Sequence, residues 1–128
     1  MIGFLLLSRF YLNRGDCYRG LNEYDKAIEE YERALSSSPS KDAEWEIMTR
    51  LSLSRYLISV DCFNTGKYHE SDAELSKCIQ LNPKVSEYYS ARGKTRYYLS
   101  MFREAYMGMI NRFFHFILIP VCVKKRFH

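Results

Sequence analysis

The sequence predicts an all-α protein in which antiparallel helix pairs stack into an α-solenoid. Small and large apolar residues recur at helical spacing along most of the chain. One layout also occurs twice, as YDKAIEEYERALSSSP at residues 24–39 and YHESDAELSKCIQLNP at 68–83, and the segment at 88–105 repeats the layout of 11–27. A recurring helix pair cannot bury its apolar face alone, so stacking against its neighbours is the expected architecture.

The first unit is predicted to contain a helix over about residues 5–20 and another over 24–37, with Gly20-Leu21-Asn22 as the turn. Gly15 and Ala27 are expected to let the two helices approach closely. The second helix carries an apolar stripe of Ala27, Ile28, Tyr31, Ala34 and Leu35. Its opposite face is expected to lie in water and carries Glu29, Glu30, Glu32 and Arg33.

The second and third units are placed by matching small residues to small and large to large. Residues 68–83 match 24–39 through the pairs Tyr24/Tyr68, Ala27/Ser71, Tyr31/Leu75, Ala34/Cys78 and Pro39/Pro83. Residues 88–105 match 11–27 through Tyr11/Tyr89, Gly15/Gly93 and Ala27/Ala105. Each unit is therefore expected to be a helix pair, and each proline to stop a helix.

This layout resembles the tetratricopeptide repeat, whose signature is W-x2-L-G-x2-Y, then A-x3-F and a late proline. The first unit supplies Tyr11, Arg14, Gly15, Tyr18, Ala27, Tyr31, Ala34 and Pro39 at those intervals. The second unit matches mainly in its second half, and the third drifts after Ala105, since Arg112 stands where a small residue should pack. The resemblance implies a right-handed superhelix of three repeats, at about 8–41, 52–85 and 86–111.

A helical insert, residues 42–51, separates the first two repeats. Ser40 or Asp42 can cap it, and its apolar residues have helical spacing, so one long helix from about Asp42 to Asn64 is expected. Trp45, the only tryptophan, lies near the free end of this helix. Two placements stay open: exposed as an anchor for a partner, or packed over the preceding helix.

Residues 112–128 form an apolar and basic C-terminal tail. Its apolar run contains Pro120 and is too short to span a bilayer. Phe113 to Ile119 can prolong the last helix and cover the face that a terminal repeat leaves open. The tail can also lie in a membrane interface, with Cys122 available for acylation, or replace further repeats of a longer protein.

Charge and cysteine content narrow the function classes. Residues 112–128 hold 4 of the 19 basic residues and no acid, so the remaining 15 balance the 15 acidic residues. Nucleic acid is not an expected partner, because the folded domain lacks a basic excess. Four dispersed cysteines, without C-x-x-C or a nearby His, suit buried positions in a reducing compartment, and no metal or cofactor is expected. The start of the chain lacks signal-peptide features, so a cytoplasmic location is predicted.

Catalysis is not expected either. The sequence contains no nucleophile elbow, phosphate-binding loop, H-E-x-x-H or calcium loop. Two of its three histidines, His115 and His128, lie in the tail, and no convergent acid, base or nucleophile can be nominated.

Helical repeats present a concave groove, lined by the first helix of each unit. The resemblance implies that this groove binds a peptide or a helix of a partner protein, as a scaffold or adaptor. The groove-facing residues are predicted to be Arg9, Leu12, Asp16 and Arg19 from the first unit, Tyr56, Val60, Phe63 and Asn64 from the second, and Ser90, Lys94, Tyr97 and Tyr98 from the third. Rings with a few flanking charges suit a ligand of mixed polarity.

Chaperone C-terminal peptides are disfavoured as ligands. Family members that bind them hold carboxylates with basic and amide side chains, whereas the matching positions here are Leu12, Asp16, Leu57, Glu87 and Ala91. The leading function is thus non-enzymatic binding of other proteins. The alternative is a membrane-peripheral protein held by its tail.

Overall fold

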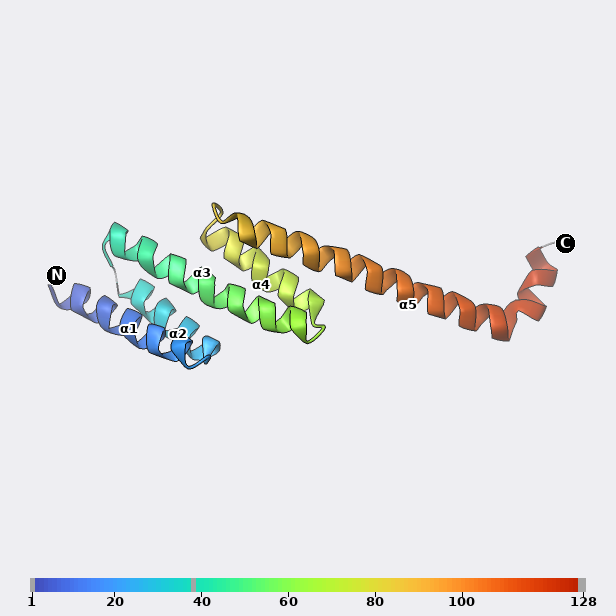
Figure 1. Cartoon of the computed structure of the whole chain (residues 1–128), viewed down its shortest axis with the longest axis horizontal. Coiled ribbons are helices and arrows are strands. Elements are labelled where there is room, and N and C mark those ends of the chain that lie inside the picture. The colour runs from blue at the N-terminus through green and yellow to red at the C-terminus, as the bar shows by residue number, and fades with distance from the viewer. Residues whose placement is uncertain (1, 38, 127–128) are drawn as a thin grey trace.

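The computed structural model describes residues 2–37 and 39–126, without the side chains of residues 2, 4, 5 and 115–126. All of the regular structure described is helical. The elements are α1 (Ile2–Gly20), α2 (Tyr24–Ser36), α3 (Lys41–Asn64), α4 (Tyr68–Leu81) and α5 (Ser86–Arg126). The helices pack in chain order, α1 on α2, α2 on α3, α3 on α4 and α4 on α5, as Figure 1 shows. This succession confirms the predicted helical-repeat solenoid.

The insert joins the second unit in one helix of 24 residues, α3, as predicted. Of the two candidate caps, Ser40 takes the role, because its side chain accepts the N–H of Ala43 at 3.3 Å. Trp45, near the beginning of this helix, is 54% exposed. The exposed placement is therefore the one that the structure adopts.

The core of the first unit joins α1, α2 and α3. Its buried members are Leu12, Ala27, Ile28, Tyr31, Ala34, Ile47 and Leu51. Gly15 is the contact point between α1 and α2, since a Cβ built on it would lie 2.5 Å from Cε1 of Tyr31. The absence of a side chain at Gly15 thus makes room for a fully buried aromatic ring.

Glu30 was predicted to face water, and this prediction is wrong. Glu30 is 3% exposed. Its carboxylate accepts hydrogen bonds from Arg14 at 2.7 and 2.8 Å and from Arg33 at 2.7 Å. A buried charge is tolerated when it is paired and hydrogen-bonded, and the two guanidinium groups supply that pairing. Arg14 stands where the repeat signature has leucine, and the buried Glu30 is its partner in this structure.

Small polar residues line the seam between α3, α4 and α5. Ser71 donates its hydroxyl to the carbonyl of Ser59 at 2.9 Å, and the Cys78 thiol donates to the carbonyl of Ser52 at 3.2 Å. The buried Tyr88 hydroxyl lies 3.0 Å from Oγ of Ser52. Burial raises the pKa of the Cys78 thiol to about 12. The seam therefore combines close helix approach with satisfied polar groups.

The third unit differs from its prediction, because its second helix does not fold back. The turns of the first two units each contain a residue with positive φ, Asn22 at 63° and Gly66 at 81°. Ser100 stands at the corresponding position, and the helix continues through it as the 41-residue α5. Glycine and asparagine adopt positive φ far more readily than serine, so the chain lacks the residue that would turn it.

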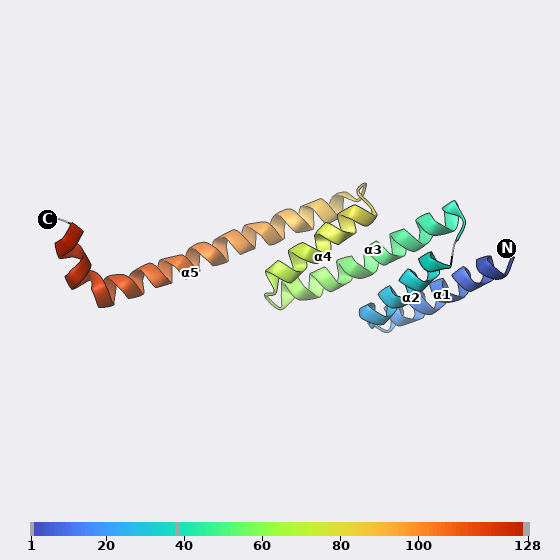
Figure 2. The same ribbon diagram turned by 180° about the vertical axis from the view of Figure 1, so that it is seen from behind.

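The extension of α5 runs away from the other four helices in both views (Figures 1 and 2). The backbone of Phe113 to Ile119 prolongs the last helix, as expected. It does not cover the end of the stack. The tail side chains from His115 onward lie outside the described residues, so the expected roles of Cys122 and the basic cluster stay predictions. No helix in the described part of the chain is long and apolar enough to cross a bilayer.

Candidate peptide-binding groove

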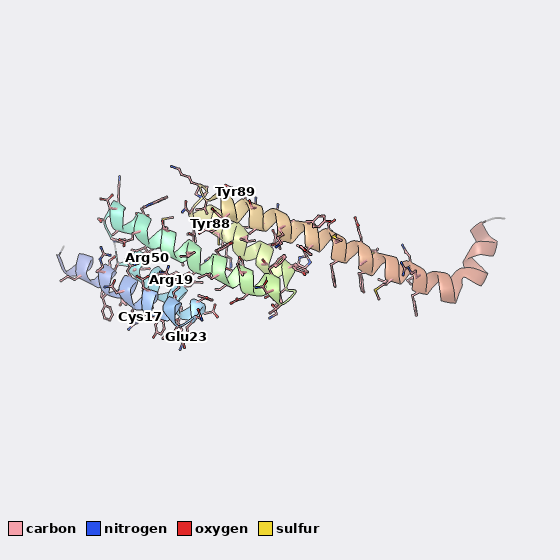
Figure 3. The ribbon with its side chains drawn as sticks, in the orientation of Figure 1. Cys17, Arg19, Glu23, Arg50, Tyr88 and Tyr89 are labelled. Carbon is pink, nitrogen blue, oxygen red and sulfur yellow. The ribbon has the colours of Figure 1, made fainter. Side chains whose placement is uncertain are left out.

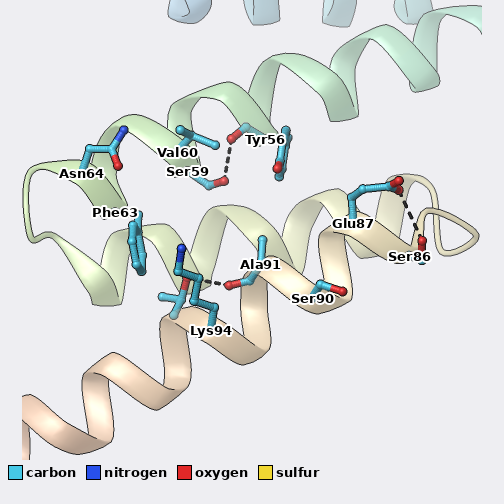
Figure 4. A pocket seen from close by; sticks show the side chains of 11 residues that line it. Tyr56, Ser59, Val60, Phe63, Asn64, Ser86, Glu87, Ser90, Ala91 and Lys94 are labelled. Atoms are coloured by element: carbon cyan, nitrogen blue, oxygen red, sulfur yellow. Dashed lines mark hydrogen bonds between the residues drawn. The ribbon is translucent and has the colours of Figure 1, made fainter.

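An open groove of about 580 Å³ runs between α3 and α5 (Figure 4). Side chains of α3 form one wall and those of α5 the other. The lining residues are Tyr56, Ser59, Val60, Phe63, Asn64, Ser86, Glu87, Ser90, Ala91, Lys94 and Thr95. Six of them belong to the predicted set: Tyr56, Val60, Phe63, Asn64, Ser90 and Lys94.

The two walls follow one helical spacing. Residues 56, 59, 60 and 63 line the groove from α3, and residues 87, 90, 91 and 94 line it from α5. Each series is i, i+3, i+4, i+7, which places its members on one helix face. The prediction missed Ser59, Ser86, Glu87, Ala91 and Thr95 as lining residues. Strict use of this spacing would have included Ser59, Glu87 and Ala91.

The centre of the groove is mainly apolar in character. Tyr56 lies against the buried Tyr88, with ring centroids 5.3 Å apart, which holds the Tyr56 ring in place. The nearby hydroxyls bond to their own helices, Ser59 to the carbonyl of Tyr56 at 2.6 Å and Thr95 to that of Ala91 at 2.8 Å. Neither of these two hydroxyl hydrogens is left to donate to a ligand, and the Tyr56 ring, Val60 and Ala91 supply the apolar part of the lining.

The two ends of the groove carry opposite charges. Nζ of Lys94 lies 5.0 Å from the centroid of the Phe63 ring, a cation–π contact (Figure 4). Asn64 follows Phe63 on α3 and also lines the groove. Within the described residues, no carboxylate lies at ion-pair distance from Lys94. Glu87 stands at the other end, where the hydroxyl of Ser86 donates to it at 3.4 Å. A ligand can therefore meet a cation at one end and an anion at the other.

The predicted residues of the first unit do not extend this groove. Three of them belong to a cluster of ion pairs between α1 and α3, which we call the α1–α3 ion-pair cluster. Its members are Arg9, Asp16, Arg19, Glu46 and Arg50. Figure 3 labels Arg19 and Arg50, on the two helices that the cluster joins. The charged side chains of this cluster pair with one another, which leaves them less available to a ligand.

Asp16 is the centre of this cluster. Its carboxylate accepts the Tyr31 hydroxyl at 2.6 Å and pairs with Arg50. Burial, followed by the hydrogen bond to Asp16, raises the pKa of Tyr31. Leu12 was also predicted to face the groove, but it is 1% exposed and belongs to the core. That placement is corrected, because the lengthened α3 adds Ile47 and Leu51 to the core that Leu12 joins.

Tyr97 and Tyr98 lie beyond the end of the groove. The Tyr98 ring contacts Phe63 and Tyr68, with centroids 5.2 and 5.7 Å apart, and Tyr97 meets Tyr98 edge-on at 5.8 Å. Tyr97 is 60% exposed and Tyr98 is 39% exposed. They form an aromatic surface that continues from Phe63 and does not line the groove itself.

The part of the chain that the structure covers contains no group of three or more His, Cys, Asp or Glu side chains able to hold a metal ion. Of the cysteines described, Cys17 is exposed, Cys62 is half-buried and Cys78 is buried, and all three are free thiols. Burial raises the pKa of Cys62 and Cys78, which makes them less reactive than an ordinary thiol.

Stacked helix pairs with a groove between first helices define a helical-repeat interaction protein. Profiles of the tetratricopeptide repeat match residues 8–41 and 54–85. The chain belongs to the tetratricopeptide repeat family, whose repeats mediate binding to other proteins. It is similar to tetratricopeptide repeat protein 16 of Homo sapiens and to the protein of that name in Macaca fascicularis. Each is 29% identical over 86 residues, which cover 67% of this chain and 10% of the relative.

Proposed function

We propose that this protein is an adaptor that binds an extended segment of a partner protein in the groove between α3 and α5. The observation that supports this function is the pairing of two aromatic rings, Tyr56 and Phe63, with unlike charges at the two ends of one groove. Aromatic anchors supply much of the binding energy at protein interfaces. The charges add orientation, because a peptide that reverses its direction meets repulsion at both ends.

The geometry also indicates the chemistry of the ligand. Glu87 and Lys94 are seven residues apart on one helix, which is about 10 Å along its axis. An extended peptide spans that length with about three residues at roughly 3.3 Å each. The preferred segment therefore has an apolar side chain for the Tyr56 and Phe63 rings, flanked by an acidic residue toward Lys94 and a basic residue toward Glu87.

Proximity labelling in cells with the full chain tests the groove. Lys94→Glu reverses the charge at one end, and Ser90→Arg places a long side chain over the groove from an exposed position. Both changes leave the buried seam untouched, unlike truncation of Tyr56, which would remove a ring that packs on Tyr88. Each variant is expected to lose the same subset of labelled partners.

Lys67→Glu is the matched control, since it makes the same charge change at an exposed lysine outside the groove. It should keep all partners, and circular dichroism should show equal helix content in every variant. Recovery of the same partners by Lys94→Glu and Ser90→Arg as by the unmodified chain would refute the groove as the binding site.

A chain without residues 115–128 is a further variant for the proximity-labelling experiment. If the groove binds the partners, this shortened chain keeps them. Loss of every partner together with release from the membrane fraction would instead support attachment through the tail and contradict the groove proposal.

A further inference from the structure

We propose that the second half of α5 is a docking site for an amphipathic helix of another protein, one that carries acidic residues along the edges of its apolar face. The site is the α5 seam, which we define as Phe102, Tyr106, Met109 and Phe113. This surface is separate from the α3–α5 groove, since none of its residues lines that groove.

The α5 seam continues the face of α5 that packs on α4. After the buried Thr95, apolar side chains follow at alternating intervals of four and three residues, first at Leu99 and then at the four residues of the seam. This spacing is the pattern of a helix that packs lengthwise on a neighbour. Thr95 meets Ser71 of α4 at 3.5 Å, whereas the seam lies beyond α4 and none of the other described helices packs on it (Figures 1 and 2).

The side chains of the α5 seam are large and exposed. All four are more than half exposed, from 56% for Tyr106 to 66% for Phe102 and Met109. A pocket of about 250 Å³ lies where the seam begins, and Tyr68, Leu99 and Tyr106 are among its lining residues. A continuous row of exposed apolar side chains is typical of an interaction site, and the pocket can receive one anchoring side chain.

Arginines flank the α5 seam on both sides. Arg103 and Arg112 lie on opposite edges of it, and none of the carboxylates in the described residues is at ion-pair distance from either. The contact between α4 and α5 shows what such an arginine receives. Arg96, seven residues before Arg103 and on the same edge, donates to Asp72 of α4 at 2.9 Å. A helix that continues along the seam is therefore expected to bring acids to both arginines.

Charge and shape argue against two other occupants. A second copy of this chain would set arginine near arginine and large side chain against large side chain, which neither electrostatics nor packing favours. The C-terminal tail from residue 115 onward contains basic residues and no acid. The tail is therefore a poor electrostatic match to the seam as well.

The direction of the α5 seam argues against a membrane surface. The seam and α4 lie on the same side of α5, because Thr95, in the same line of residues, packs on α4. A flat bilayer laid along the whole seam would run into α4 and the turn before it (Figure 1). A single helix, about 10–12 Å across with its side chains, can instead lie along the seam in line with α4.

Fluorescence anisotropy with labelled, designed helical peptides and the full chain tests the proposal. The peptides share one stripe of leucine and alanine and differ only at its edges, which carry Glu, Gln or Lys. The Glu peptide is expected to bind at least about tenfold more tightly than the Lys peptide, because it alone complements Arg103 and Arg112. Equal binding of the three peptides, or no binding of the Glu peptide, would overturn the proposal.

Met109→Glu and Met107→Glu are a matched pair on the same helix. Both methionines are exposed, but they lie about 160° apart around the axis, so Met109 belongs to the seam and Met107 does not. Met109→Glu is expected to weaken binding of the Glu peptide by about tenfold, the loss of one interface anchor. Met107→Glu should leave binding unchanged, and equal effects of the two changes would contradict the site.

Ser90→Arg, which blocks the α3–α5 groove, should also leave binding of the Glu peptide unchanged. The docking site on α5 and the groove can therefore fail independently. Loss of binding in this variant would place the peptide in the groove and refute the docking site.

Hydrogen exchange of the unmodified chain covers the case in which the variants fold poorly. The Glu peptide should add protection in residues 102–113 and none in α1, and the reverse pattern would refute the site. Light scattering and sedimentation with phosphatidylserine vesicles test the other occupants. A dimer that Met109→Glu abolishes, or vesicle binding that this change abolishes, would assign the seam to a second copy or to a membrane and overturn the proposal.

Discussion

The ring of Tyr31 fills the space that a side chain at Gly15 would need. A methyl group on this glycine would lie 2.5 Å from Cε1 and 2.8 Å from Cδ1 of the tyrosine ring. The ring has no exposed surface, and its hydroxyl is held by Asp16 at 2.6 Å. It therefore cannot swing aside to admit a larger residue.

Gly15→Ala is expected to destabilise the protein. Alanine is normally better than glycine inside a helix by about 0.5–1 kcal/mol, but the added Cβ meets a fixed ring, and overpacking costs about 1–3 kcal/mol. Urea unfolding followed by circular dichroism measures the difference. Gly20→Ala, where the Cβ meets nothing within 4 Å, is the control and should not be destabilised in this way. Equal stability of the two variants would contradict the described packing.

Stability is expected to fall as the pH rises above 9.0. Burial raises the pKa of the Cys78 thiol from 9.0 to about 12, so the unfolded chain loses this proton first. Between those values the folded state binds more protons, and the free energy of unfolding falls by up to about 1.4 kcal/mol per pH unit for one such group. Tyr31 and Tyr88, whose pKa values are also raised by burial, act in the same direction.

Cys78→Ser isolates the thiol contribution, because a serine hydroxyl does not titrate in this range. Urea unfolding on either side of pH 9.0 should give a shallower loss of stability for the variant than for the unmodified chain. Identical slopes would show that Cys78 is not buried as described.

Arg50→Met is expected to lower the free energy of unfolding modestly, by about 0.2–1 kcal/mol, because Arg50 and Asp16 are both about 30% exposed and water screens the pair. A double-mutant cycle with Asp16→Asn measures the coupling, which should shrink as salt is added. Arg9→Met, at a more exposed position of the same cluster, should have almost no effect. A coupling that does not respond to salt would argue against an ionic contact.

Trp45 fluorescence is expected to resemble that of tryptophan in water in the folded protein. The side chain is 54% exposed near the beginning of α3, so iodide should quench it efficiently and unfolding should change its emission little. Circular dichroism, recorded in parallel, should show a clear transition. A large blue shift in the folded state would place Trp45 against an apolar surface instead.

The helices of the first two units could be predicted from the sequence because the features that determine them lie close together in the chain. Helical spacing, Ser40 as a cap and the paired small and large residues all act within a few turns. Glu30 was placed incorrectly because an acid on a helix is usually solvated. Its burial depends on Arg14, which lies on another helix, and single-helix periodicity does not register such a pair.

The lining of the candidate groove was predictable where it depends on the same spacing. Tyr56, Val60 and Phe63 lie on one face of α3, and the groove contains all three. Leu12 was misplaced because the lengthened α3 adds Ile47 and Leu51 to the core beside it, a contact between helices far apart in the chain. The third unit was misread because its packing residues match as far as Ala105, whereas Ser100 stands where the turns of the other units have a residue with positive φ.

Ser100 lies at the point where the third unit differs in shape from the first two: they form a folded helix pair, and it forms one long helix. In the first two units the chain reverses at Asn22 and at Gly66, whereas at Ser100 the helix continues. The second half of α5 thus keeps helix-packing residues but carries them away from the other four helices (Figure 1). In helical-repeat proteins of this kind, a change at one turn residue can alter the reach of a molecule without any change in the residues that make contact.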